Sequence, residues 1–209
     1  MTKAWLRVEL AVLFIALPLG FRFKPFPFPP IPALWLVTVY CLYRLIKDPN
    51  FDRTLLWNPA ALAKFLPKML FIFVPLALLI GILVLLAFPQ KLFNIVRSTP
   101  LLWAVVMVLY PPLSVYPQSI VYRAFLFHRY QDLFPNPYAR IVMSAILFSF
   151  VHIIFRNAIA VIFTLIGGVL FALRYYESRS LFTSTFEHAL YGCWMFTIGL
   201  GEFFYRGMR

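Results

Sequence analysis

The sequence predicts an all-α fold, a polytopic bundle of seven or eight membrane helices. Hydrophobic residues make up 63% of the 209 residues and charged residues only 12%, and the mean hydropathy is +0.85. Soluble domains are about half apolar and a quarter charged, so a water-soluble core cannot absorb this much apolar surface. The apolar residues also fall in long stretches, near the length of about 20 residues with which a helix crosses a bilayer.

Seven apolar stretches follow one another along the chain. They span residues 8–20, 31–46, 67–89, 99–116, 140–155, 158–174 and 181–205. A mixed stretch at residues 118–130 carries Arg123, His128 and Arg129 among aromatic residues. It is either a shorter helix that lines a polar cavity or an interfacial helix. Residues 1–209 are expected to form a single membrane domain.

The first connection is predicted to be a loop. Lys3 and Arg7 precede the first apolar stretch, and no small-residue cleavage site follows it, so we expect an uncleaved first span. Residues 21–32 read FRFKPFPFPPIP. Proline has no backbone donor and cannot continue a helix, so this segment is expected to be an extended aromatic connection at the membrane surface.

Basic residues between the apolar stretches indicate the partners and the topology. The net charge is +12, but Lys and Arg are scattered instead of forming a stripe, which favours anionic lipid headgroups as partners and disfavours nucleic acid. A basic cluster predicts a cytoplasmic loop between the second and third stretches, with the N-terminus inside. The cluster comprises Lys47, Arg53, Lys64 and Lys68.

Small and sulfur-containing residues within the apolar stretches have structural interpretations. Cys41 and Cys193 show no CxxC spacing and are expected to be buried thiols. The pair Gly167 and Gly168 indicates close helix packing rather than a phosphate loop, because small residues let helix backbones approach.

Few polar side chains lie at membrane depth, where each charged residue costs about 2.5 to 3.5 kcal/mol to insert. They are Arg123, His152, Glu187 and His188. Each has a structural alternative: Arg123 could snorkel to an interface, and the histidines could be hydrogen-bonded between helices. Glu187 points about 100° away from His188 around a helix and could pair with an arginine. His128 is interpreted as an interfacial anchor.

The order of these residues resembles the CPBP family of intramembrane proteases, the CAAX prenyl proteases and bacteriocin-processing proteins. That family carries two adjacent glutamates followed by three residues and an arginine, then Phe-x-x-x-His, then a histidine with Asn four positions on. In this chain Arg123 matches the arginine, Phe148 and His152 match the second motif, and His188 matches the third, with Gly192 where Asn is usual. The resemblance covers residues 113–201, and residues 1–98 carry no such motif.

The glutamate pair is missing. Its two positions hold Gln118 and Ser119, and no acid lies between Asp52 and Asp132. In the family, as the resemblance implies, a glutamate activates water while a histidine helps to hold it and other polar groups support the oxyanion. Three accounts follow: a natural pseudoenzyme, a variant inactivated at position 119, or a role taken over by another acid such as Glu187.

The same residues could in principle support two other kinds of chemistry. Ser119 could act as a nucleophile only with His152 or His188 within hydrogen-bond reach. Zinc needs three or four protein ligands, and the two histidines lack an acidic partner, so no tightly bound metal or other cofactor is expected.

The predicted catalytic residues are Ser119, Arg123, His152 and His188, supported by Gln118, Phe148, Glu187 and Gly192. The resemblance implies an intramembrane endopeptidase that acts on membrane-associated or prenylated peptides. The alternative is a catalytically silent pseudoprotease that binds or regulates a membrane partner, and a small transporter or channel is a third possibility. The predicted location is a membrane crossed several times, the plasma (inner) membrane in a bacterial cell.

Overall fold

The computed structural model describes residues 2–23 and 30–204, and within these ranges the chain is helical and has no strand. Four helices are uninterrupted: α3 (Pro30–Lys47), α4 (Ala60–Ala87), α10 (Ala158–Ser178) and α11 (Leu181–Thr197). Two further helices consist of segments joined by π-helical turns: α1 (Lys3–Ala11) continues into α2 (Leu17–Phe23), and α6 (Pro100–Tyr110) continues through α7 (Tyr116–Ser119) into α8 (Leu126–Arg129). The remaining two are the short α5 (Asn94–Ser98) and α9 (Pro137–Val151). These eight helices of the described residues confirm the predicted all-α fold.

Within residues 2–23 and 30–204, five helices are long and apolar enough to cross a membrane. They are Lys3–Phe23, Ala60–Ala87, Pro100–Arg129, Pro137–Phe155 and Ala158–Ser178. Their lengths of 19 to 30 residues meet the requirement of a bilayer about 30 Å thick. The chain is therefore an integral membrane protein.

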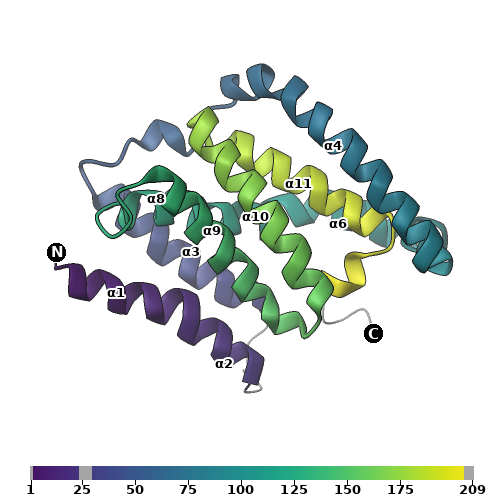
Figure 1. Ribbon diagram of the computed structural model, residues 1–209, viewed down its shortest axis with the longest axis horizontal. Helices are drawn as coiled ribbons and strands as arrows, with labels where there is room; N and C mark the ends of the chain where they lie inside the picture. Colours follow the sequence, from purple (N-terminus) through teal and green to yellow (C-terminus); the bar gives the residue numbers. More distant parts are fainter. Residues whose placement is uncertain (1, 24–29, 205–209) are drawn as a thin grey trace.

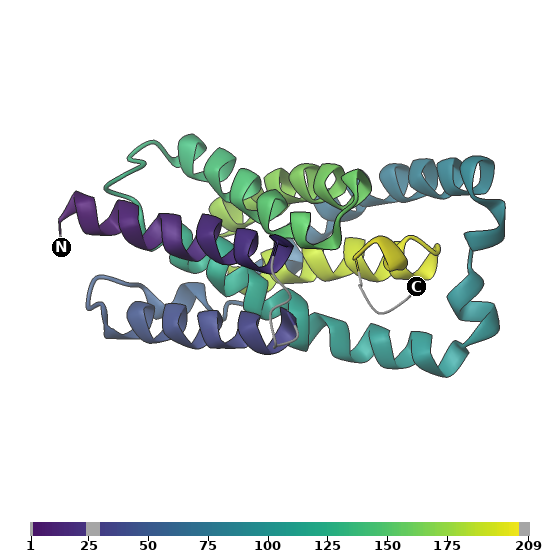
Figure 2. The ribbon, with the colours of Figure 1, turned by 90° about the horizontal axis from the view of Figure 1, so that it is seen from below.

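The helices α9, α10 and α11 lie at the centre of the bundle (Figure 1). The continuous α1 and α2 run along one side of them, and α4 lies on the opposite side, against α11. Seen from below, α1 and α3 share one end of the molecule, while α4 ends and α6 begins at the other (Figure 2). The largest buried cluster joins the first helix to the centre, with Phe14 packed edge-on against Tyr122 and Tyr130.

Close packing of α9 and α10 confirms the interpretation for Gly168, whereas the nearest neighbour of Gly167 is Phe171 of the same helix. A Cβ atom on Gly168 would lie 2.9 Å from the Cα atom of Ala145. Only glycine therefore lets these two backbones approach so closely. Of the two cysteines, Cys41 is buried and Cys193 is partly buried.

The mixed stretch at 118–130 is not a separate helix, which corrects both expectations for it. It continues the fourth apolar stretch, so that one helix runs from Pro100 to Arg129. Proline removes a backbone donor and crowds the preceding turn, but here wide π-helical turns at Pro111–Val115 and Ile120–Phe125 replace regular α-helical turns. Residues 120–127 are buried in the bundle, not spread on an interface.

Three boundaries also differ from the sequence predictions. The predicted loop at residues 21–32 is helical at both ends, because α2 continues to Phe23 and prolines are tolerated in the first turn of α3. Residues 24–29 lie outside the described residues. Lys64 and Lys68 belong to α4 and not to the loop before it. The last helix ends at Thr197, because Gly199 adopts a left-handed φ of 92° and turns the chain.

Candidate active site

Arg123 lies inside the bundle, on the π-helical turn between α7 and α8. Its side chain has no solvent exposure, so the guanidinium does not snorkel to an interface. The guanidinium carbon lies 4.4 Å from the centre of the Phe148 ring and 5.4 Å from that of Phe171. These contacts are cation–π interactions. None of its three nitrogens has a hydrogen-bond partner among the described residues.

The two histidines of the predicted site pack against the same phenylalanine. The His152 ring lies 4.8 Å and the His188 ring 5.3 Å from the Phe148 ring, measured between ring centres. His188 also stacks on Phe171, at 4.6 Å and an interplanar angle of 18°. The structure therefore places Arg123, His152 and His188 around the ring of Phe148.

Local structure fixes the orientation of His152. The helix α9 ends at Val151, and His152 opens a 3₁₀ turn that leads to the left-handed Arg156. His152 Nδ1 lies 2.6 Å from the Phe148 carbonyl oxygen. A carbonyl can only accept, so Nδ1 donates, and in the neutral ring Nε2 is left as an acceptor. His188 differs, because its Nδ1 has no partner among the described residues.

A cavity of about 310 Å³ lies beside the two histidines. It is bounded by α4, α10 and α11, and most of its wall is apolar. Phe148, His152 and His188 line it, and they bring the polar groups of the site to an otherwise apolar wall. Two other lining residues, Leu83 and Ile166, are 53% and 55% exposed on the outer surface of their helices. The cavity thus opens sideways, toward the surface that faces lipid.

Gln118 and Ser119 do not line this cavity and use their donors within their own helix. The Ser119 hydroxyl donates to the Val115 carbonyl at 2.9 Å, and Gln118 Nε2 donates to the Ser114 hydroxyl at 2.8 Å. No hydrogen bond between described residues joins Ser119 to either histidine. The nucleophile hypothesis therefore lacks the contact on which it depends, and no Asp or Glu of the described residues lines the cavity.

The comparison with protein families matches the part of the chain in which these residues lie. The family model described as Type II CAAX prenyl endopeptidase Rce1-like matches residues 96–194. This segment is Rce1-like. It extends from α5 to α11 and includes every residue predicted for the site. No curated protein and no solved structure matches the chain.

Within the Rce1-like segment, Gly192 faces a tyrosine that the sequence interpretation missed. A Cβ atom on Gly192 would collide with the ring and hydroxyl of Tyr110, and both residues line the cavity. The Tyr110 hydroxyl therefore occupies the space into which the expected Asn side chain would extend. Tyr110 belongs to an ordinary apolar run, and no pattern in the sequence marks it.

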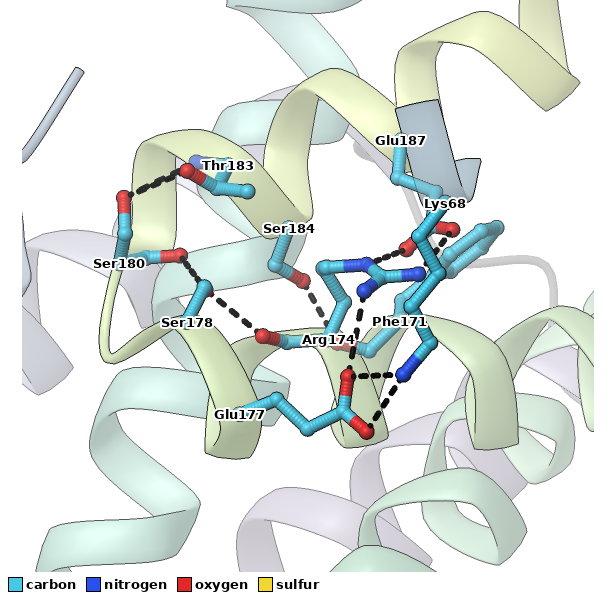
Figure 3. Close-up of polar contacts among 9 residues, drawn as sticks. All are labelled: Lys68, Phe171, Arg174, Glu177, Ser178, Ser180, Thr183, Ser184 and Glu187. Carbon is cyan, nitrogen blue, oxygen red and sulfur yellow. Dashed lines mark hydrogen bonds and ion pairs between the residues drawn. The ribbon is translucent and has the colours of Figure 1, made fainter. Parts of the chain in front are cut away.

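Glu187 forms an ion pair with an arginine (Figure 3). It does not line the cavity. Arg174 donates through Nε to one carboxylate oxygen at 3.0 Å and through a terminal nitrogen to the other at 3.2 Å. Arg174 also contacts Glu177 at 3.2 Å, and Glu177 contacts Lys68 of α4 at 2.9 Å. With both oxygens engaged, Glu187 is poorly placed to activate water. The alternative that Glu187 pairs with an arginine is thus confirmed, and the charge at the end of the apolar stretch 158–174 could have indicated Arg174 as that partner.

Two further expectations concern His128 and a metal. His128 Nε2 lies 2.9 Å from a carboxylate oxygen of Asp48, which follows the end of α3. The hydrogen bonds that Asp48 accepts from His128 and from the Asn50 backbone lower its pKa. His128 thus ties two helix ends together, away from the cavity. Among residues 2–23 and 30–204, no three His, Cys, Asp or Glu side chains gather to hold a metal ion. The absence of a cofactor stays a prediction.

Proposed function

We propose that the chain is an intramembrane endopeptidase scaffold for membrane-associated or prenylated peptides, in which the water-activating base is missing. The observation that carries this proposal is the apolar cavity of the Rce1-like segment, with His152 and His188 in its wall. An apolar wall suits a lipid chain or a membrane peptide, and the histidines provide the polar groups that a peptide bond needs. The membrane is the plasma (inner) membrane in a bacterial cell.

The chemistry assigned to the site is peptide hydrolysis. A water oxygen attacks the peptide carbonyl carbon while a base takes a proton from the water, and the C–N bond then breaks as that proton reaches the leaving amine. His152 presents Nε2 as an acceptor and is suited to hold the water. The cationic Arg123 stabilises negative charge nearby. The carboxylate base belongs at position 118 or 119, where this chain has Gln118 and Ser119.

Restoring the acid tests the proposal. The native chain and its Ser119→Glu and Gln118→Glu forms are reconstituted in liposomes with prenylated and bacteriocin-leader peptides, and cleavage is followed by mass spectrometry. We expect one glutamate form, Ser119→Glu first, to cleave at least about 100-fold faster than the native chain, since general base catalysis contributes about 10²–10⁴-fold. Adding His188→Ala to that form should abolish the gain. Silence of all forms toward every peptide would contradict the proposal.

The ion pair of Glu187 with Arg174 favours a second function, the binding of a membrane partner without catalysis. The Glu187 carboxylate is occupied by Arg174, and no acid lines the cavity among the described residues. A protein with this function would hold a prenylated peptide or a membrane protein in the same cavity, surrounded by lipids, without cleaving it. Saturable binding of a prenylated peptide together with silence of both glutamate forms would favour this function over the first.

A further inference from the structure

The guanidinium of Arg123 is the one group in the site whose charge the described residues leave uncompensated. It is fully buried, and its Nε and both terminal nitrogens lack acceptors among these residues. Two other arginines of the bundle have carboxylates: Arg129 contacts Glu9 at 2.8 Å, and Arg174 contacts Glu187 at 3.0 Å. A buried charge without a partner is costly, so a buried guanidinium whose donors lack acceptors indicates a binding site for an anion.

The surroundings of Arg123 indicate what such a site would take. The faces of Phe148 and Phe171 cover the guanidinium, and the same two rings contact His188, whose Nδ1 also lacks a partner. A planar guanidinium offers paired donors that match a carboxylate. Within the chain, the alternative acceptor is the unpartnered amide oxygen of Gln118, but a neutral amide does not compensate the charge.

We propose that Arg123 binds a carboxylate that the chain itself does not supply. A glutamate at position 119 would lie four residues before Arg123, close enough on the helix to offer its own carboxylate, whereas Ser119 has none and donates to its own backbone. The carboxylate comes either from a small free anion, such as formate, or from the C-terminus of a bound peptide. Both share the chemistry that Arg123 recognises.

Binding of a carboxylate by Arg123 extends the proposed function. Only the use of that carboxylate in hydrolysis rests on the proposed function. A carboxylate held by Arg123 lies beside the rings that contact His188 and can accept the proton of the attacking water. Binding itself is measured without hydrolysis. A silent peptidase would therefore refute the proposed function and leave the carboxylate site intact.

Thermal unfolding in detergent measures the binding. The full chain is titrated with sodium formate, with sodium chloride keeping the ionic strength constant, and compared with its Arg123→Met and Arg123→Lys forms and with a control, Arg53→Met, at an exposed arginine outside the cavity wall. We expect a saturable rise in Tm on the order of 5 °C for the native chain. The rise should vanish in Arg123→Met, shrink in Arg123→Lys, which keeps the charge without the planar fork, and persist in Arg53→Met. An equal rise in Arg123→Met would overturn the proposal, and so would the absence of any rise in the native chain with both formate and a prenylated peptide that has a free C-terminus.

A second arm identifies the source of the carboxylate. A prenylated peptide with a free C-terminus is compared with the same peptide carrying a C-terminal amide. A larger rise in Tm with the free acid, lost in Arg123→Met, assigns the site to the peptide terminus. Equal rises with both peptides, together with the rise by formate, assign it to a free anion. If Arg123→Met does not fold, the Arg123→Lys form decides by the same comparison.

Discussion

At the scale of single residues, Gly192 departs from the family pattern together with Tyr110, which fills the space beside it. A small residue on α11 leaves room for a large one on α6, and the tyrosine brings a hydroxyl to the cavity wall. A hydroxyl can donate to a developing oxyanion, as an amide can. This exchange keeps one polar group near His188, although it comes from a different helix.

The Tyr110 hydroxyl is therefore expected to support the oxyanion of an activated chain. In the Ser119→Glu form, Tyr110→Phe should lower kcat about tenfold to a hundredfold with little change in KM, because a donor that acts in the transition state is lost. Tyr116→Phe, on the same helix but away from the cavity, is the matched control. Equal rates in the Tyr110→Phe form and its parent would exclude the role.

Sequence spacing could predict the residues that approach one another here, but not their partners. The motif order picked out Arg123, Phe148, His152 and His188, which the structure gathers around one ring. Their catalytic roles stay predictions. Tyr110 escaped notice because its position opposite Gly192 depends on how two distant helices pack, and helical periodicity carries no such information.

At the scale of elements, the joint between α10 and α11 holds one wall of the cavity. Besides the Arg174–Glu187 pair, the Ser184 hydroxyl donates to the Phe171 carbonyl at 2.7 Å (Figure 3). Phe171 in turn stacks on His188. The joint therefore sets the register in which His188 meets Phe171, and we predict that Glu187 acts through it as a positioning residue.

Replacing one residue of the Arg174–Glu187 pair is expected to destabilise the fold more than replacing both. Arg174→Met leaves Glu187 buried and unpaired, and a half-broken buried pair costs about 3 to 5 kcal/mol. Arg174→Met combined with Glu187→Met should recover most of that loss. Unfolding of the single and double forms by sodium dodecyl sulfate in mixed micelles measures this coupling. Strictly additive effects would show that the pair contributes no coupling.

Helix boundaries were harder to predict than the helices themselves. The sequence divides residues 99–130 into an apolar stretch that ends at 116 and a mixed stretch that begins at 118, yet one helix runs from Pro100 to Arg129, with π-helical turns at Pro111–Val115 and Ile120–Phe125. The sequence marked the lengths of apolar runs well, since membrane thickness sets them. It could not reveal how the packing of neighbouring helices would absorb a proline.

At the scale of the whole molecule, the half without motifs completes the cavity. Leu76, Leu79 and Leu83 of α4 line it, although α4 lies outside the Rce1-like segment. Lys68 anchors one end of α4 to Glu177, and Trp194 donates to the Ala77 carbonyl at 3.1 Å further along. The motifs located the histidines, while the cavity itself follows from tertiary packing that no local pattern encodes.

The sideways opening of the cavity is expected to be the route by which a lipid chain enters. Ile166 lines the opening and is 55% exposed, whereas Ile162, one turn earlier on α10, is 57% exposed and lies outside the cavity. Ile166→Trp should therefore weaken binding of a fluorescent prenylated peptide in liposomes about tenfold, because a larger ring fills apolar space that the lipid chain needs. Ile162→Trp adds the same ring to the same lipid-facing helix and should leave the affinity unchanged. Equal affinities for both tryptophan forms and the native chain would place the lipid chain elsewhere, whereas equal losses in both would attribute the effect to the altered membrane surface of α10.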